Sequence, residues 1–262
     1  MPGNYAHYRF GVQLIEGMTP EQQRSVGRFR QLYEMGLHGP DILYYADPLG
    51  IGSSGKLGRQ FHSQTGISFF EHACRAYRLR PSEGGEVYLY GLLAHYTLDS
   101  TTAPFIDKNV VPGKRSRRQI EAEFDRYLLS VDGKKPLHKY DCSRHISLTP
   151  GEAEVAAAFY PGVNANQLRK FAANMARCTH MLAMDAGSAR DLKLKSLQIA
   201  APETAQRVIP IRAHRNCYPL NQSLLRLTEM ANTRYFVLLE GLRLHVTNSV
   251  PLTTDFAATF GE

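Results

Sequence analysis

The stretch from Tyr90 to Ile106, which reads YGLLAHYTLDSTTAPFI, constrains the structure of this chain more than any other segment. Its first half is apolar and compatible with a buried helix. The metal-competent side chains there are His95 and Asp99, which lie four residues apart and therefore on one helix face. Burying both groups without partners is costly, so either a metal ion or a set of further polar groups must satisfy them.

Helical periodicity recurs along the rest of the chain, whereas β-type alternation of useful length does not. Thr19 is a typical helix N-cap and Gly36 a typical helix end, so one helix is expected over residues 20–35. A Gly-Pro turn places Asp41 at the start of a short helix. Further helices are expected at 7–17, 67–80, 90–106, 120–131, from Thr149, at 164–184 and at 220–248.

These elements predict one all-α domain over residues 1–262, a multi-helix bundle of about eight to ten helices. A loop rich in glycine and serine is expected at 48–58, and an irregular joint at 202–219. With 43% hydrophobic and 21% charged residues, the chain has the composition of an ordinary globular protein.

The net charge of +7 suits an anionic partner such as a phosphate ester, a lipid head group or nucleic acid. Part of this charge lies in a basic run at 108–118, which a solvated loop would also explain. No aromatic residue interrupts the run and no nucleic-acid module accompanies it, so nucleic acid is not the expected partner.

The four cysteines are widely spaced and form no CxxC pair, so reduced thiols are expected and a thiolate zinc site is not. The N-terminus lacks the features of a secretion signal, and no apolar run reaches the length of a membrane span. A cytoplasmic location without stable membrane insertion is therefore expected.

Candidate metal ligands gather in the first half of the chain. Oxygen and imidazole ligands without thiolates suit zinc, or a similar divalent ion, used for hydrolysis. Sites with several such ions lower the pKa of bound water and hold both oxygens of an in-line phosphoryl displacement. The candidates are His7, His38, Asp41, His62, His72, His95, Asp99 and Glu121. Of these, His38 and His72 are expected to be polar neighbours or donors that orient the carboxylates, and not ligands themselves.

The order of these motifs resembles that of the zinc-dependent phospholipase C family, especially a short bacterial branch of cytoplasmic type. Relatives of that family share an all-α fold with the P1-type nucleases. The resemblance is carried by YAHYRFG with His7, GLHGPDILYY with Asp41, GRQFH with His62, GLLAHYTLDS with His95 and Asp99, and RRQIEAEFD with Glu121. It covers the first half of the chain, with a weaker match in PLTTDFAATFGE at the C-terminal end.

The resemblance implies that Asp41, His62, His95 and Asp99 hold one zinc ion. It also implies that Asp99 is shared with a neighbouring zinc ion, which His7 ligates. The family holds a further zinc ion with two histidines and a glutamate. Glu121 matches that glutamate, but the histidine positions fall on Ala103 and Arg117.

The third ion is therefore expected to be missing, because alanine cannot ligate and a guanidinium does not deprotonate. Glu121 then either stays a ligand or pairs with Arg117 one turn earlier. Replacement ligands are a further alternative, offered by His138, Asp141, Cys142 and His145.

These observations favour a zinc-dependent phosphoric-ester hydrolase that cleaves a phosphodiester. The resemblance suggests Asp41 as the general base, and Arg117 could stabilise the developing negative charge. The expected partner is a phosphate-ester small molecule or a phospholipid head group. Two alternatives remain: a catalytically impaired member that binds a phosphorylated ligand or a protein, and, less favoured, a P1-type nuclease.

Overall fold

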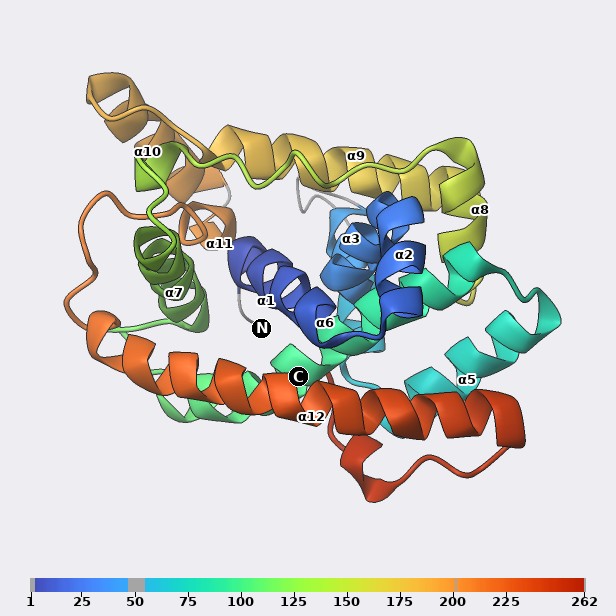
Figure 1. Cartoon of the computed structure of the whole chain (residues 1–262). Coiled ribbons are helices and arrows are strands. Elements are labelled where there is room, and N and C mark those ends of the chain that lie inside the picture. The colour runs from blue at the N-terminus through green and yellow to red at the C-terminus, as the bar shows by residue number, and fades with distance from the viewer. Residues whose placement is uncertain (1–2, 47–54, 201, 262) are drawn as a thin grey trace.

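The computed structural model describes residues 3–46, 55–200 and 202–261, and every regular element within these ranges is a helix (Figure 1). The all-α prediction is confirmed, and most of the loop expected at 48–58 lies outside the described residues. The α-helices are α1 (Asn4–Gly17), α2 (Pro20–Arg28), α3 (Arg30–His38), α4 (Lys56–His62), α5 (Gly66–Leu79), α6 (Glu83–Lys108), α7 (Arg117–Val131), α8 (Pro150–Ala157), α9 (Ala165–Leu182), α10 (Ser188–Ala200), α11 (Pro202–Ala205) and α12 (Asn221–Asn248). Short 3-10 helices are η1 (Gly39–Ala46), η2 (Leu137–Lys139), η3 (Tyr218–Leu220) and η4 (Thr254–Phe256).

Helix α6 runs through the middle of the bundle, as the apolar stretch 90–106 predicts (Figure 1). From Gly84 to Asp99 every residue except Glu86 is buried. The helices α1, α2, α3, α5, α7, α8 and α12 all contact it. A helix covered on all sides has to be apolar all round, which explains why polar side chains are few in this stretch.

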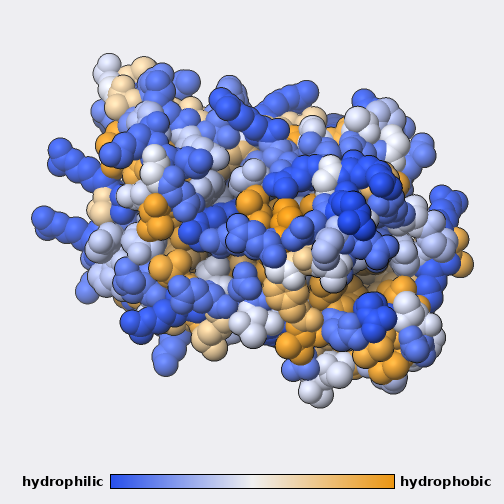
Figure 2. All heavy atoms as spheres, in the orientation of Figure 1, coloured by the Kyte–Doolittle hydropathy of each residue, from blue (hydrophilic) through white to orange (hydrophobic). Residues whose placement is uncertain are grey.

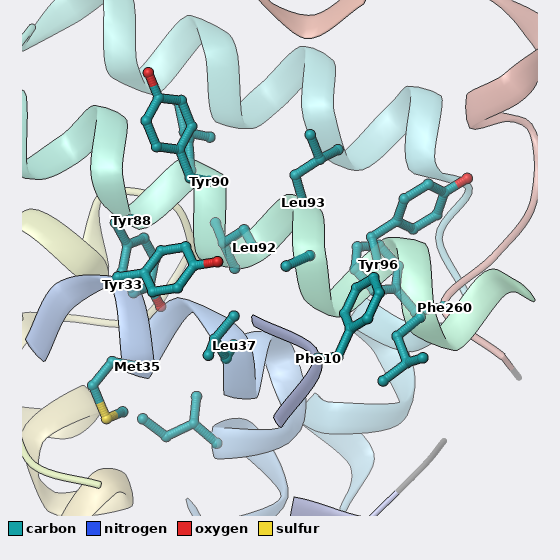
Figure 3. Packing of buried hydrophobic residues seen from close by; sticks show 14 of the residues in the cluster. Phe10, Tyr33, Met35, Leu37, Tyr88, Tyr90, Leu92, Leu93, Tyr96 and Phe260 are labelled. Atoms are coloured by element: carbon teal, nitrogen blue, oxygen red, sulfur yellow. The ribbon is translucent and has the colours of Figure 1, made fainter. Parts of the chain in front are cut away.

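Two glycines let α3 and α6 cross with their backbones in contact. A Cβ atom at Gly91 would lie 2.4 Å from the carbonyl oxygen of Tyr33 and 2.7 Å from the Cα atom of Gly36. Tyr33 and Leu37 of α3 then join the buried cluster around α6, together with Leu92 (Figure 3). This close crossing fixes the end of α3 against the segment of α6 that carries His95.

The helix expected over residues 20–35 is in fact two helices, because the chain bends at Phe29, whose φ is −113° and ψ is 39°. Its expected end at Gly36 is also wrong. Helix α3 continues to His38 and stops at Gly39, where φ is positive at 48°. The short helix expected from Asp41 is present as the 3-10 helix η1, whereas α10 lies in a segment for which the sequence suggested no helix.

The face drawn in Figure 2 is mostly hydrophilic, with apolar side chains in several separate groups. Among the helices of the described segments, none combines the length and apolarity needed to cross a membrane. The expected absence of a spanning helix thus holds for these segments, while the cytoplasmic location stays a prediction.

Candidate metal centre

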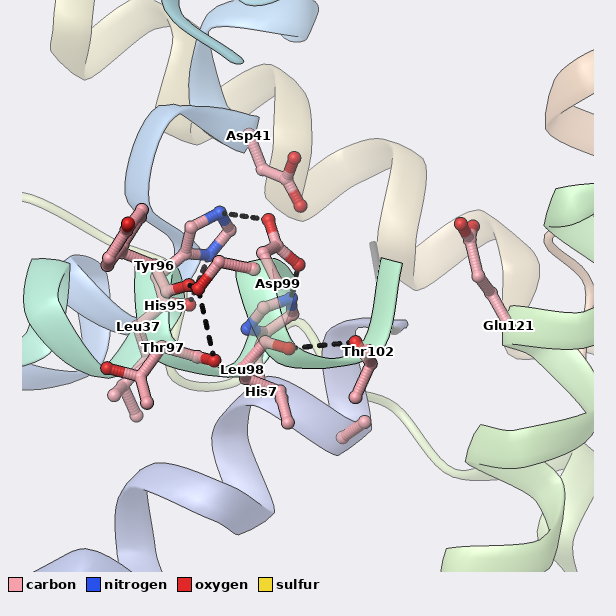
Figure 4. A network of polar contacts seen from close by, with 12 residues as sticks. His7, Leu37, Asp41, His95, Tyr96, Thr97, Leu98, Asp99, Thr102 and Glu121 are labelled. Carbon is pink, nitrogen blue, oxygen red and sulfur yellow. Dashed lines mark hydrogen bonds and ion pairs between the residues drawn. The ribbon is translucent and has the colours of Figure 1, made fainter. Parts of the chain in front are cut away.

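Five of the six ligands predicted from the sequence meet in the core of the bundle (Figure 4). They come from four elements: His7 from α1, Asp41 from η1, His62 from α4, and His95 and Asp99 from α6. His62, His95 and Asp99 are each 0% exposed. Buried imidazoles and carboxylates in contact require either mutual hydrogen bonds or a bound cation.

Asp99 lies between two imidazoles. Its Oδ2 is 3.0 Å from Nε2 of His95, and its Oδ1 is 3.2 Å from Nε2 of His7. Neither approach has the geometry of a hydrogen bond, and both carboxylate oxygens lack a hydrogen-bond partner among the described residues. Atoms bound to one tetrahedral ion at about 2.0–2.1 Å lie about 3.3 Å apart, so this spacing suits ligands that share an ion.

A second group adjoins the first. Nε2 of His62 lies 3.1 Å from Oδ1 of Asp41, and His95 completes the group. In each group, one potential ligand atom per residue lies within 4.8 Å of the others. His7, His95 and Asp99 form one group and Asp41, His62 and His95 the other, so His95 belongs to both. Either group could bind a metal ion, and His95 can ligate only one ion at a time through Nε2.

Two backbone carbonyl groups set the orientation of the imidazoles. Nδ1 of His95 lies 3.0 Å from the carbonyl oxygen of Leu37, and Nδ1 of His62 lies 2.7 Å from that of Gly58. A carbonyl oxygen only accepts hydrogen bonds, so in both rings Nδ1 carries the proton. In a neutral ring the Nε2 lone pair then faces the carboxylates, which is the usual orientation of a metal-ligating histidine.

Gly39 allows η1 to pass close to the imidazole of His95. Its φ is 48°, and a Cβ atom there would lie 2.6 Å from the ring of His95. A larger residue would therefore meet both backbone strain and a steric clash. The turn at Gly39 is what brings Asp41 close to His62 and His95.

Asp125 of α7 fixes the start of α1. Its carboxylate accepts hydrogen bonds from the backbone N–H groups of Tyr5, at 3.1 Å, and Ala6, at 2.9 Å. These amides belong to the first turn of α1, which has no partners of its own for them. His7 follows directly, so the contact holds its imidazole beside Asp99. Sequence reasoning missed Asp125, because nothing in its local sequence indicates a partner so distant along the chain.

The electrostatic balance of the site favours ionised carboxylates. Burial alone raises the pKa of Asp99, but His95 and His7 outweigh it and bring the pKa well below its ordinary value. Burial likewise opposes ionisation of Asp41, yet the close contact with His62 and the charge of His95 lower its pKa. Burial also disfavours the charged form of His95, but Asp99 raises its pKa, so a bound cation would take the place of that proton.

The sixth predicted ligand, Glu121, belongs to neither group. It projects from α7, apart from the others (Figure 4). Its Oε2 lies 3.6 Å from Nη1 of Arg118, whereas Arg117 pairs with Asp107. Ala103 is buried at the position where the resemblance implies a histidine. No third ligand group forms among the described residues. The loss of one ion stays a prediction.

Arg117 does not reach the centre. Its Nε donates a hydrogen bond to Oδ1 of Asp107 at 2.9 Å, and Nη2 contacts the same oxygen. Asp107 is near the end of α6 and Arg117 opens α7, so this ion pair joins two helix ends. Its guanidinium is therefore held by a carboxylate and not by the site.

A cavity of about 70 Å³ opens beside Asp41. Two arginines that sequence reasoning missed, Arg118 and Arg207, contribute to its wall. The residues that line it are Gly3, Asn4, Asp41, Tyr45, Arg118, Glu121, Ala122, Asp125, His138, Tyr140, Cys142, Thr179, Leu182, Ala183, Arg207 and Ile209.

The suggested replacement ligands are dispersed. His138 and Cys142 line the cavity, whereas Asp141 pairs with His180 at 2.8 Å. The ring of His145 stacks on that of His38, with centroids 5.0 Å apart. His38 is fully buried, and neither of its ring nitrogens has a hydrogen-bond partner among the described residues, so it does not orient the carboxylates through a hydrogen bond.

Comparison of the chain with models of protein families, with curated proteins and with solved structures finds no match. The resemblance to the phospholipase C family therefore stays a prediction from the motifs.

Proposed function

We propose that this chain is a metal-dependent phosphoric-ester hydrolase that resembles phospholipase C and cleaves a phosphodiester with metal-activated water. The observation that carries the proposal is the pair of ligand groups around His95. Their nitrogen and oxygen atoms face one another without hydrogen bonds, and they adjoin a cavity through Asp41. Because Nδ1 of His95 is protonated, its Nε2 can ligate only one ion, so a second ion would rely on the remaining ligands and on Asp99 as a shared carboxylate. Sites with two such ions promote phosphoryl displacement.

Zinc is the proposed ion, because the ligands are imidazoles and carboxylates without thiolates. One or two ions would be held by His7, Asp41, His62, His95 and Asp99. When bound, zinc lowers the pKa of a coordinated water and polarises the phosphoryl oxygens. The backbone hydrogen bonds of His62 and His95 hold the two rings in the ligating orientation.

Asp41 is the proposed general base. Its pKa lies below the ordinary range, despite burial, because of His62 and His95, so the carboxylate is ionised at neutral pH. The same residue lines the cavity, where it can accept a proton from a water that attacks phosphorus. The substrate is then a phosphate-ester small molecule or a phospholipid head group that places its phosphate in this cavity.

The proposal is tested with zinc-loaded protein and a chromogenic phosphodiester such as bis(p-nitrophenyl) phosphate. Asp99→Asn should lose the metal and hydrolysis together, because the amide is neutral and a poor ligand. Asp255→Asn is the matched control, since Asp255 is exposed and outside both ligand groups. Hydrolysis by Asp99→Asn at the wild-type rate would refute the proposal.

One alternative function has support from a specific observation, the buried Ala103 and the Asp107-paired Arg117 at the expected histidine positions. A catalytically impaired protein would keep the metal and bind a phosphorylated ligand or a protein partner without turnover. Metal-loaded wild type that binds phosphate but hydrolyses neither phosphodiesters nor phosphomonoesters would favour this alternative. A nuclease activity would instead require nucleic-acid binding that weakens steeply with salt.

A further inference from the structure

The cavity beside Asp41 contains two guanidinium groups that come from separate parts of the chain. Arg118 is in the first turn of α7, and Arg207 follows α11. Nη1 of Arg207 donates a hydrogen bond to the Tyr45 hydroxyl at 3.0 Å. The charges of Arg207 and Arg118 both act on that hydroxyl, which places the two guanidiniums near one residue.

Among the described residues, one hydrogen bond from Arg207 and one contact of Arg118 account for few of the N–H donors of these guanidiniums. Each guanidinium has five N–H groups. Arg207 is partly buried, and the ion pairs among the described residues do not include it. Arg118 is paired only loosely, since its Nη1 lies 3.6 Å from the nearest oxygen of Glu121. The charges of Asp41 and Glu121 act on Arg207 without forming an ion pair among the described residues, so its guanidinium can still donate hydrogen bonds to an anionic ligand.

The volume of the cavity limits what such an anion can be. A water molecule occupies about 10–15 Å³ by this kind of measure, so about 70 Å³ admits roughly five water-sized atoms. A phosphoryl group with its oxygens fits this size, whereas a nucleoside or an acyl chain does not. The remainder of an ester would therefore lie outside the cavity.

We propose that Arg118 and Arg207 form a phosphate-binding subsite that holds the non-bridging oxygens of a phosphoryl group next to Asp41. The planar guanidinium groups of the two arginines can each donate two parallel hydrogen bonds to such oxygens. The choice of phosphate rests on the proposed function, but binding of the anion does not require the metal ion. Glu121, which the resemblance assigns to the missing third ion, lines the same cavity.

The acidic residues around the cavity set the conditions for binding. Glu121 competes with the ligand for Arg118, so phosphate has to displace it. Burial raises the pKa of Asp125 to about 7, which reduces its negative charge near neutral pH. The pKa of Asp41 is lowered by His62 and His95, and its negative charge also acts on Arg207.

The test is calorimetric titration of inorganic phosphate into chelator-treated, metal-free protein. Arg118→Gln and Arg207→Gln should each weaken binding about tenfold to a hundredfold, the usual effect of losing charged hydrogen bonds. Arg117→Gln is the matched control, because Arg117 is the neighbouring residue, has a similar exposure of 24% against 21%, and is paired with Asp107. Equal losses in Arg117→Gln and Arg118→Gln, or wild-type affinity in Arg118→Gln, would overturn the subsite.

Two further variants separate ligand binding from a structural role. Glu121→Gln should strengthen phosphate binding, because it removes the competing carboxylate; weaker binding would count against the subsite. Arg207→Lys keeps the charge but loses the planar fork, so its affinity should lie between those of wild type and Arg207→Gln. Thermal unfolding of each variant checks that it is folded.

Failure of this inference is distinguishable from failure of the proposed function. If the protein binds no metal but its phosphate binding depends on Arg118 and Arg207, the subsite is supported and the hydrolase proposal is refuted. Conversely, Arg118→Gln and Arg207→Gln could leave metal binding, hydrolysis and phosphate affinity all equal to wild type. That result would refute the subsite and leave the proposed hydrolase standing.

Discussion

The crossing of α3 and α6 provides the sharpest test of how the fold positions the candidate metal centre. The perturbation is Gly91→Ala, which adds one methyl group to a buried helix. Its Cβ atom would lie 2.4 Å from the Tyr33 carbonyl oxygen and 2.7 Å from the Gly36 Cα atom. Both are backbone atoms, so no side chain can rotate away and the two helices have to move apart.

The expected size follows from two opposing effects. Alanine favours a helix over glycine by about 1 kcal/mol, whereas overpacking a core costs about 1–3 kcal/mol. Backbone contacts call for the upper end of that range, so the free energy of unfolding should fall by about 2 kcal/mol. The control is Gly27→Ala on exposed α2, where no described atom lies within 4 Å of the new Cβ atom. That variant should gain about 0.5–1 kcal/mol.

The assay is urea unfolding of metal-free wild type and both variants, followed by circular dichroism. Gly91→Ala should lower the midpoint and Gly27→Ala should raise it. Because α3 also supplies the Leu37 carbonyl that orients His95, Gly91→Ala should weaken zinc binding as well. If Gly91→Ala were as stable as wild type, the two backbones would not be in contact and the argument would be refuted.

Two further predictions concern buried charge. Burial lowers the pKa of His145 from the ordinary 6.5 to about 4. As pH falls, the imidazole is therefore protonated in the unfolded chain before it is protonated in the folded one. Folding stability is lost between about pH 6.5 and about pH 4. His145→Gln should remove about 3 kcal/mol of that loss, measured as the difference in unfolding free energy between pH 7 and pH 4; an unchanged difference would contradict the assignment. Glu123 is fully buried and bonds Arg126 through both its oxygens, so Glu123→Gln should cost about 3 kcal/mol by leaving that cation unpaired. In the exposed pair of Glu240 and Arg243, which has the same i,i+3 spacing, Glu240→Gln should leave stability unchanged; equal effects of the two variants would show that burial is not the cause.

The central helix and the ligands on it could be predicted from sequence for a simple reason. A run that is apolar on every face has to be buried, and the spacing of His95 and Asp99 puts both on one side whatever surrounds them. The chain between α2 and α3 was harder to predict. Phenylalanine is not a residue type that signals a bend, so the bend at Phe29 could not be predicted. Gly36 was expected to end a helix, but it lies where α3 crosses α6.

The arginines show the limit of sequence reasoning at the site. Arg117 and Arg118 are adjacent, and only the start of α7 decides which one faces the cavity. Ser116 is the N-cap of that helix, so Arg117 is its first residue. In this register Arg117 pairs with Asp107, and Arg118 lies near Glu121. Arg207 follows α11 in a segment without a motif, so nothing in its surroundings indicated a role.

The most direct test of the metal centre is the metal content per chain of protein purified without added metal, measured by elemental mass spectrometry. Wild type, Asp99→Asn and the control Asp255→Asn should be compared before and after reconstitution with zinc. We expect one or two zinc ions per chain in wild type and in Asp255→Asn, and their loss in Asp99→Asn. Wild type that binds no zinc after reconstitution, or Asp99→Asn that keeps its full content, would contradict the assignment of these residues as metal ligands.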